Sequence, residues 1–384
     1  MLTHKLTPAR HTRRLGALCY IMTVPRCTRG SGDPMALEIT AEELTRNPAW
    51  HLHDLDMQRG EMRFLEATPE TFLISAFLDN RIAYTGTQVH GFPLDAIAAA
   101  LRRHPPPPRR VAFLFHTSFC CSSLLSRSLQ REGRMLVLRE PWVLRRLGDL
   151  KRGVIARGQP WYPQGPSLLE MALQLLVKTW SESESVLIKP TNVANDLAID
   201  LLALRPEAHA LLLHSDLESF LISNLKKTDE TQHKLPLLAK LFDQDTSYSE
   251  RLGIKLDSLD FLQSVVVVWH AQRMQLQALL ASGAASRLRT LDSAVLLARP
   301  AETLSKATEF LGQMLDSGEA RGIVAGPVWN THAKDPFSTY DSSRREAENH
   351  EVATRHADEV RTALRWAEGL LSQVPPDLTQ SLLP

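Results

Sequence analysis

Short apolar runs alternate with longer amphipathic segments along the middle of the chain. The segments VAFLF, MLVLRE, SVLIKPTN and AHALLLHS each carry an apolar run with the length of a buried strand. Segments with helical periodicity stand between them, for example LLEMALQLLVKTWSES and VANDLAIDLLALRP. Strands that alternate with helices predict a parallel sheet covered on both faces. We therefore predict an α/β fold with three layers, in which helices flank a parallel sheet.

The alternation of strand-like and helical segments is unclear in one later segment and resumes after it. Residues 228–258 are polar and less periodic, which predicts a loop or a mobile cap. LDFLQSVVVVWHAQRMQLQALLAS is long enough to be a buried helix despite its β-branched run. SRLRTLD then predicts a strand, and PAETLSKATEFLG predicts a helix that Gly312 ends.

A smaller set of elements precedes the sheet. A capping box at Thr40-x-x-Glu43 and the helix FPLDAIAAALRR, with short strand-like segments between them, predict a small N-terminal α+β module over residues 35–103. The prolines of HPPPPRR make residues 104–110 a stiff, extended linker. Residues 111–384 then form the main domain.

Residues 1–34 differ from the rest of the chain in charge. No acidic residue precedes Asp33, whereas six lysines and arginines do. RRLGALCYIMTV loosely resembles a signal peptide, but its apolar core is short and is broken by Tyr20 and Thr23. We expect a disordered extension, or one misassigned upstream of a start at Met35.

Composition excludes several classes of protein. Lys and Arg number 44 and Asp and Glu 43, which gives no sign of nucleic-acid binding. No run approaches the ~18 apolar residues of a membrane span. Four cysteines form no disulfide framework in 384 residues, so we expect a reducing, cytoplasmic compartment. The motifs H-E-x-x-H, C-x-x-C, G-x-S-x-G and G-x-G-x-x-G are absent, and His51-x-His53 has no convincing ligand spacing, so we expect no metal site.

The candidate site residues come directly after the predicted strands, because ligands bind a parallel sheet at the carboxyl ends of its strands. These residues are His116 to Ser123, Arg139 and Glu140, Lys189, and His214 to Asp216.

Each of these groups has an alternative, purely structural interpretation. The turn before the helix SSLLSRSL either binds an anion through the helix N-terminus or ends in an ordinary serine N-cap. Lys189 either binds an anion at the end of its strand or is a solvated loop lysine. Glu140 accepts a substrate proton or pairs with Arg139. Ser215 and Glu218 fit a capping box.

Four stretches together resemble the sulfotransferases, P-loop proteins that use 3′-phosphoadenosine 5′-phosphosulfate. FLFHTSFCCSSLLSRSL is similar to the family's 5′-phosphosulfate loop, and MLVLREPWVL to the strand that follows it. AHALLLHSDLESFLISNLKK is similar to the 3′-phosphate region, and LRTLDSAVLLARPAETLSKATEFLG to a late strand and helix. The resemblance covers roughly residues 110–312 and implies a three-layer fold like that of the P-loop nucleoside-triphosphate hydrolases.

The resemblance also implies roles for single residues. The 5′-phosphosulfate would lie on the turn, and Ser223 matches a serine that contacts the 3′-phosphate. Ser215 stands where the family usually has arginine, Phe119 where it has lysine or arginine, and Cys121 where it has glycine. The residues of the implied turn are Ser118, Phe119, Cys120, Cys121, Ser122 and Ser123.

The implied activity is transfer of a sulfuryl group to a hydroxyl or amine of a small-molecule or carbohydrate acceptor, with no metal. Another cation must then replace the one missing at Phe119, and the candidates are Lys189, Arg127 and His116, in that order. Glu140 or His116 would take the acceptor proton. Arg344 or Lys334 in the tail would return to the 3′-phosphate, or they are ordinary surface charges.

Two other functions stay open at this stage. One is a non-catalytic nucleotide-binding protein of the same fold, and the other is a P-loop kinase-like enzyme that uses ATP. The sequence does not predict the oligomeric state.

Overall fold

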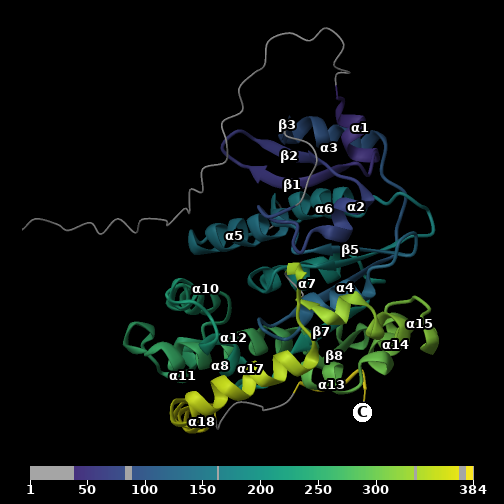
Figure 1. The fold of residues 1–384 in the computed structure, drawn as a ribbon. Helices are drawn as coiled ribbons and strands as arrows, with labels where there is room; N and C mark the ends of the chain where they lie inside the picture. The colour runs from purple at the N-terminus through teal and green to yellow at the C-terminus, as the bar shows by residue number, and fades with distance from the viewer. Residues whose placement is uncertain (1–38, 83–88, 162–163, 333–334, 372–377, 384) are drawn as a thin grey trace, which may run out of the picture. The chain divides into compact units, whose positions relative to one another are not determined.

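The computed structural model describes residues 39–82, 89–161, 164–332, 335–371 and 378–383 (Figure 1). Glu38–Pro384 form one compact unit. The extension predicted for residues 1–34 lies outside the described residues.

A five-stranded parallel sheet forms the centre of this unit. Its strands lie in the order β5-β6-β4-β7-β8, and every neighbouring pair is parallel. All five strands were predicted, four from their apolar runs and the last from SRLRTLD. They are β4 (Val111–His116), β5 (Met135–Arg139), β6 (Ser185–Lys189), β7 (Ala210–His214) and β8 (Leu288–Asp292).

Alternate side chains of each strand enter two different apolar cores. Phe113 and Phe115 of β4 belong to a core with Leu144 of α5 (Trp142–Ala156) and Leu169 of α6 (Gln164–Leu176). Leu114, between them, belongs to the core on the opposite face. That core also holds side chains of α4 (Ser122–Leu129), α14 (Pro300–Phe310) and α15 (Ser317–Ala325). The predicted three-layer α/β fold is therefore confirmed.

An antiparallel sheet precedes the parallel one and shares its first core. The order of this sheet is β1-β2-β3, and Leu52 and Phe64 lie in the same core as the α5 residue Leu147. Figure 1 shows these strands next to α5 and α6. The boundary predicted at residues 104–110 stays a prediction. The elements are α1 (Ala41–Arg46), β1 (Trp50–Asp56), β2 (Glu61–Glu66), α2 (Pro69–Ile74), β3 (Val89–Pro93) and α3 (Leu94–Arg103).

The capping box predicted at Thr40 is half formed. The Thr40 side chain accepts a hydrogen bond from the Glu43 N–H at 3.2 Å. The Glu43 carboxylate accepts instead from the Trp50 indole N–H at 3.3 Å. The predicted start of the helix is therefore correct, but the Glu43 side chain binds Trp50 and does not close the capping box.

The loop predicted for residues 228–258 is wrong. The segment is helical, and Leu235, Ala239 and Phe242 are buried against α12 (Phe261–Leu280). The spacing of these apolar residues is that of one helix face, but the polar runs on either side of them obscured it. The helices are α9 (Asp229–Gln232), α10 (Leu235–Thr246), α11 (Tyr248–Leu252) and the 3-10 turn η2 (Leu256–Ser258).

The helices of this region form a third apolar core. It holds residues of α10 and α12 and of α8 (Leu217–Leu225) and α18 (Ala357–Leu371). Among the described residues, no helix is both long and apolar enough to span a membrane. The remaining elements are η1 (Asn192–Leu197), α7 (Ala198–Leu204), η3 (Ala285–Arg287), α13 (Ser293–Ala298), α16 (Pro327–Asn330), β9 (Thr331–His332), β10 (Asp335–Thr339) and α17 (Ser342–Arg355).

The end of the described chain lies along the edge strand β8. The Thr290 N–H donates to the Gln380 carbonyl at 2.9 Å, and the Leu382 N–H donates to the Thr290 carbonyl at 2.8 Å. Ser381 forms a parallel bridge with Thr290. Residues 378–383 therefore cover one edge of the parallel sheet.

A buried guanidinium joins the segment after α2 to the end of β5. The Arg139 side chain is 1% exposed and donates to the carbonyl groups of Phe72, Leu73 and Ser75. The Leu78 N–H donates to the Arg139 carbonyl at 2.7 Å. This anchor places residues 75–82 at the carboxyl edge of the parallel sheet.

Replacing Arg139 by alanine removes the donor from these buried carbonyl groups. We expect the free energy of unfolding to fall by about 3 kcal/mol, because buried acceptors lose their partners. Urea denaturation measures this loss. R145A is the matched control, because Arg145 pairs with Asp149 near the surface; its effect should stay below about 0.5 kcal/mol. An equal loss in both variants would contradict the anchor.

Candidate functional site

The turn between β4 and α4 has an unusual backbone. Phe119 and Cys121 have φ angles of 56° and 62°, in the left-handed region that favours glycine. Cys121 is the N-cap of α4, but its side chain forms no capping hydrogen bond. Strained positions of this kind collect at ligand-binding sites. The turn therefore has the backbone of a glycine-rich loop without glycine.

Several backbone N–H groups of this turn are open. Among the described residues, no hydrogen bond is found from the N–H of Phe119, Cys121 or Ser123. Open N–H groups at a helix N-terminus carry a partial positive charge and bind anions. Ser122 is buried and Ser123 is half-buried, and both begin α4. These residues can offer backbone and hydroxyl donors to an anion.

The two cysteines of the turn are poor nucleophiles. Cys120 is fully buried, its thiol contacts the Thr117 carbonyl at 2.9 Å, and burial raises its pKa to about 12. Burial also raises the pKa of the Cys121 thiol, although Arg345 and Lys226 oppose that shift. Both side chains are therefore protonated at neutral pH, and only their backbone is suited to bind an anion.

A glutamine that the sequence analysis missed fixes the first residue of the turn. The Gln272 side chain on α12 is fully buried. Its oxygen accepts from the Ser118 N–H at 2.8 Å, the Ser118 hydroxyl at 3.0 Å and the Asn192 amide at 2.9 Å. A polar residue in the middle of a buried apolar helix was the signal that could have found it.

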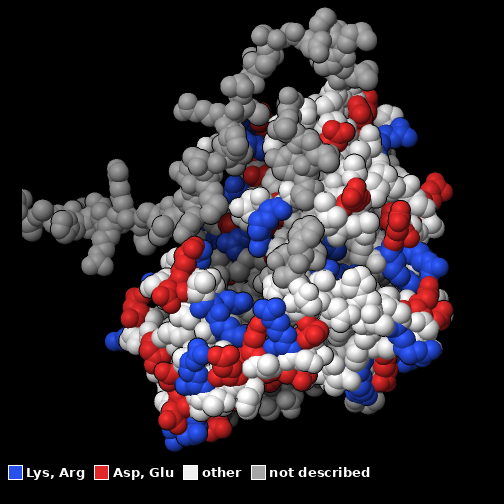
Figure 2. Space-filling view, viewed as in Figure 1, with Lys and Arg blue, Asp and Glu red and all other residues white. Residues whose placement is uncertain are grey.

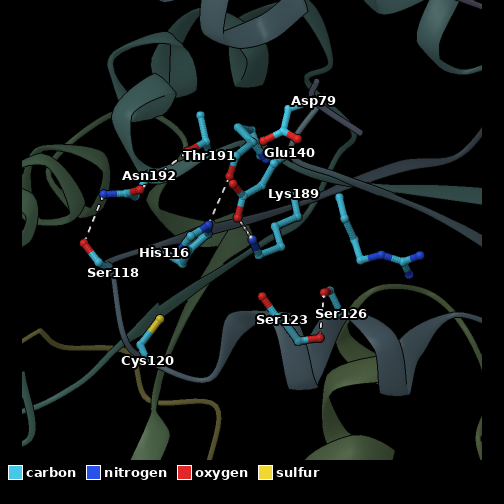
Figure 3. A network of polar contacts seen from close by, with 12 residues as sticks. Asp79, His116, Ser118, Cys120, Ser123, Ser126, Glu140, Lys189, Thr191 and Asn192 are labelled. Carbon is cyan, nitrogen blue, oxygen red and sulfur yellow. Dashed lines mark hydrogen bonds and ion pairs between the residues drawn. The ribbon is translucent and has the colours of Figure 1, made fainter. Parts of the chain in front are cut away.

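Lys189 and Glu140 meet at the ends of β6 and β5. Their Nζ and Oε1 atoms are 2.5 Å apart, Lys189 is fully buried, and Glu140 has a φ angle of 56°. Figure 3 shows the two side chains pointing toward each other, with Asp79 beside Glu140. The partner of Glu140 is thus Lys189 and not Arg139, whose guanidinium binds backbone carbonyl groups.

The segment after α2 adds side chains to this edge. The Lys189 Nζ lies 5.8 Å from the centroid of the Phe77 ring, and the Arg81 guanidinium lies 4.0 Å from the same centroid. Arg81 also forms an ion pair with Asp79. The sequence pattern gave no sign of these contacts.

His116 joins the ends of β4 and β6. Its Nδ1 lies 2.8 Å from the Thr117 carbonyl oxygen, and its Nε2 lies 3.1 Å from the Pro190 carbonyl oxygen. Burial, followed by the charge of Lys189, lowers its pKa to about 3 despite these two contacts. The ring is therefore neutral at pH 7, and both nitrogens face backbone. This geometry favours a structural role over that of a base.

The two serines predicted for the 3′-phosphate lie after β7 and on α8. Ser215 is fully buried, its hydroxyl has no partner among the described residues, and its carbonyl accepts from the Trp269 indole N–H at 2.9 Å. The predicted cap is wrong by one residue, because Asp216 caps α8 and accepts from the Ser219 N–H at 2.7 Å. Ser223 is half-buried on α8.

A cationic cavity of about 300 Å³ lies next to the turn. The charges of Lys226 and Arg345 act on the Cys121 thiol, and the Lys227 Nζ lies 5.2 Å from the centroid of the Phe119 ring. Figure 2 shows Lys and Arg side chains beside a hollow near the middle of one face. The cavity is lined by Lys226, Lys227, His332, Thr339, Tyr340, Arg344 and Glu348.

The acid in this cavity is already engaged. The Glu348 carboxylate accepts from the Arg344 guanidinium at 3.1 Å and from the Tyr340 hydroxyl at 2.9 Å. Burial lowers the pKa of Lys226 and of Lys227. The cavity therefore has positive charge that an anion would stabilise. Arg344 lines this cavity, its predicted contact with the 3′-phosphate stays a prediction, and Lys334 lies outside the described residues.

Arg127, another candidate cation, points elsewhere. Its guanidinium donates to the His332 carbonyl at 3.3 Å and to the Thr331 hydroxyl at 3.4 Å. It therefore holds the segment around β9 against α4. The described residues contain no cluster of three or more His, Cys, Asp or Glu side chains that could hold a metal ion.

Comparison with known proteins gives matches among solved structures. No family model matches the chain, and no curated protein sequence matches it significantly. A sulfotransferase from Alicyclobacillus acidocaldarius is 11% identical, with 71% of this chain and 98% of that chain covered and a TM-score of 0.33. The sulfotransferase domain from the curacin biosynthetic pathway is 12% identical, with coverage of 65% and 98% and a TM-score of 0.35. A retinol dehydratase in complex with androsterone and the inactive cofactor PAP is 11% identical, with coverage of 86% and 98% and a TM-score of 0.30.

The left-handed backbone at Cys121 gives a stability test. We expect C121G to be more stable than C121A by about 1 kcal/mol, because both lose the thiol but only glycine adopts this φ angle without strain. Thermal unfolding of the two variants measures the difference. If C121A is as stable as C121G, position 121 is not strained.

The neutral state of His116 gives a pH test. The ring titrates near 6.5 in the unfolded chain and near 3 in the folded chain, so the unfolded chain binds the extra proton between these values. Stability is therefore fully present above pH 6.5 and is lost as the pH falls. From pH 7 to pH 5, urea denaturation should show wild type losing about 2 kcal/mol more than H116Q. Equal losses would show that His116 is not held neutral.

Proposed function

We propose that this protein transfers a sulfuryl group from 3′-phosphoadenosine 5′-phosphosulfate to a hydroxyl or amine of a small-molecule or carbohydrate acceptor. The observation that carries the proposal is the turn from Ser118 to Ser123, whose N–H groups at Phe119, Cys121 and Ser123 are open at the start of α4, beside the cationic cavity. A helix N-terminus and several cations together suit a ligand with more than one phosphate-like group.

The nucleotide would bind across the turn and the cavity. The N–H groups of Phe119, Cys121 and Ser123, with the hydroxyls of Ser122 and Ser123, would hold the phosphosulfate. Lys226 and Arg344 line the cavity and would face the other phosphate. Because burial disfavours the charge on Lys226, a bound anion would recover part of that cost.

Glu140 and Lys189 would act on the acceptor. The acceptor oxygen or nitrogen attacks sulfur in line, the new bond to sulfur forms, and the bond from sulfur to the 5′-phosphate oxygen breaks. Glu140 takes the acceptor proton, and the nucleotide leaves as adenosine 3′,5′-bisphosphate. Lys189, 2.5 Å from Glu140, orients the carboxylate and offsets negative charge near it. Most of the rate would come from positioning and electrostatics, as in phosphoryl transfer.

The segment after α2 would form a wall of the acceptor site. Phe77 lies beside Lys189, and the ion pair of Asp79 and Arg81 covers that ring. The ring is buried beneath these groups, so a sugar or another small molecule that presents a hydroxyl would meet the polar side chains of this segment.

Nucleotide binding is the first test. Adenosine 3′,5′-bisphosphate at a hundred times its Kd should add about 2.7 kcal/mol of stability and raise the melting temperature by several degrees. ATP at the same concentration should raise it much less. A larger shift with ATP would favour the kinase-like alternative and contradict the proposal.

The role of Lys189 is the second test. K189M should lower transfer of labelled sulfate to a panel of phenol, alcohol, amine and sugar acceptors by about 100-fold or more. Its affinity for adenosine 3′,5′-bisphosphate should fall much less than its transfer activity, because Lys189 bonds to Glu140 and acts on the turn only through its charge. Retained transfer in a folded K189M variant would exclude this role. Nucleotide binding without transfer in wild type would favour the non-catalytic alternative.

A further inference from the structure

The turn that binds the proposed anion contains no cation of its own. Phe119 occupies its middle, with a φ angle of 56° and a half-buried ring. The ring packs edge-on against Phe220 of α8, with 5.5 Å between the centroids and 69° between the planes. This contact holds the ring against α8.

Lys227 brings a positive charge to this ring. Its Nζ lies 5.2 Å from the ring centroid, a distance at which an ammonium group is attracted to an aromatic face. The backbone of Lys227 is fixed just beyond the end of α8, since its N–H donates to the Asn224 carbonyl at 3.0 Å. Its carbonyl accepts from the Gln232 side chain at 3.1 Å. The backbone from which the Lys227 side chain extends toward the ring is therefore fixed.

Three other cations near the turn already have side-chain partners. Lys189 is fully buried against Glu140. Lys226 donates to the Asn349 side chain at 2.7 Å, and Arg344 binds Glu348. Lys227, in contrast, forms no ion pair with a carboxylate within 4.0 Å among the described residues. In the described part of the chain, the Lys227 ammonium has the Phe119 ring as its close contact and no side-chain hydrogen bond.

We propose that Lys227 supplies, from the end of α8, the positive charge that the turn lacks, and that the Phe119 ring holds this ammonium beside the bound anion. The identity of the anion as a phosphosulfate rests on the proposed function, but the role of Lys227 needs only a phosphate-like ligand. Burial and the neighbouring Lys226 lower the pKa of Lys227, and Glu348 opposes this shift. An anion bound beside the ammonium group would therefore stabilise its positive charge. Two residues, an aromatic one in the turn and a lysine outside it, thus replace one loop cation.

Calorimetry with two probes tests this role. Inorganic pyrophosphate reports on anion binding alone, and adenosine 3′,5′-bisphosphate reports on the proposed nucleotide. K227M should bind both probes about 10- to 100-fold more weakly than wild type, the usual effect of losing one charged hydrogen-bond donor. The affinity of K227R for each probe should stay within about threefold of that of wild type, because arginine keeps the positive charge.

Two further variants make the test specific: one removes an unrelated lysine, and the other moves the positive charge from position 227 to position 119. Lys234 pairs with Glu230 on the surface, so K234M should bind both probes like wild type. The double variant F119K/K227M places the charge directly in the turn and should recover at least about tenfold of the lost affinity. Unchanged pyrophosphate binding in K227M, or no recovery in a folded F119K/K227M chain, would overturn the assignment.

The two probes also separate this inference from the proposed function. If wild type binds pyrophosphate but not adenosine 3′,5′-bisphosphate, the proposed nucleotide is wrong, and K227M with pyrophosphate still decides the role of Lys227. If wild type binds neither probe, both proposals are wrong.

Discussion

A fully buried ammonium group at the end of an inner strand requires a counter-ion, and the site is arranged around this requirement. An unpaired Lys189 would cost several kcal/mol in its dry environment, so Glu140 must stay within reach. This pairing joins β5 to β6 at their carboxyl ends. It also explains the neutral state of His116, since the charge of Lys189 adds to the effect of burial on that ring. The Phe77 ring covers the ammonium from the segment after α2.

Parallel strands could be predicted because they are buried on both faces. Val111–His116 and Ala210–His214 stand out as continuous apolar runs, which is the pattern expected of strands covered on both faces. The helix Leu235–Thr246 was missed because polar segments flank its short apolar stretch on both sides. The choice between Ser215 and Asp216 as N-cap depends on where the strand turns, which the side chains alone do not determine.

The site was predictable only where it depends on strand ends. Glu140, Lys189 and Ser118 could be expected at one edge, because parallel strands end together. The partners of these residues come from distant segments. Gln272 lies 154 residues after Ser118 in the sequence, and its contact with the turn follows from the packing of α12. No periodic pattern encodes such a contact, and Lys227 and Phe77 reach the site in the same way.

The strand β8 would be an exposed edge of the parallel sheet without the residues that lie along it. The hydrogen bonds of Thr290 with Gln380 and Leu382 occupy backbone groups that another chain could otherwise pair with. Residues 378–383 therefore protect the protein against edge-to-edge association. A tag or a proteolytic cut that pulls them away would favour aggregation through β8, while the turn at the start of α4 would keep its own hydrogen bonds.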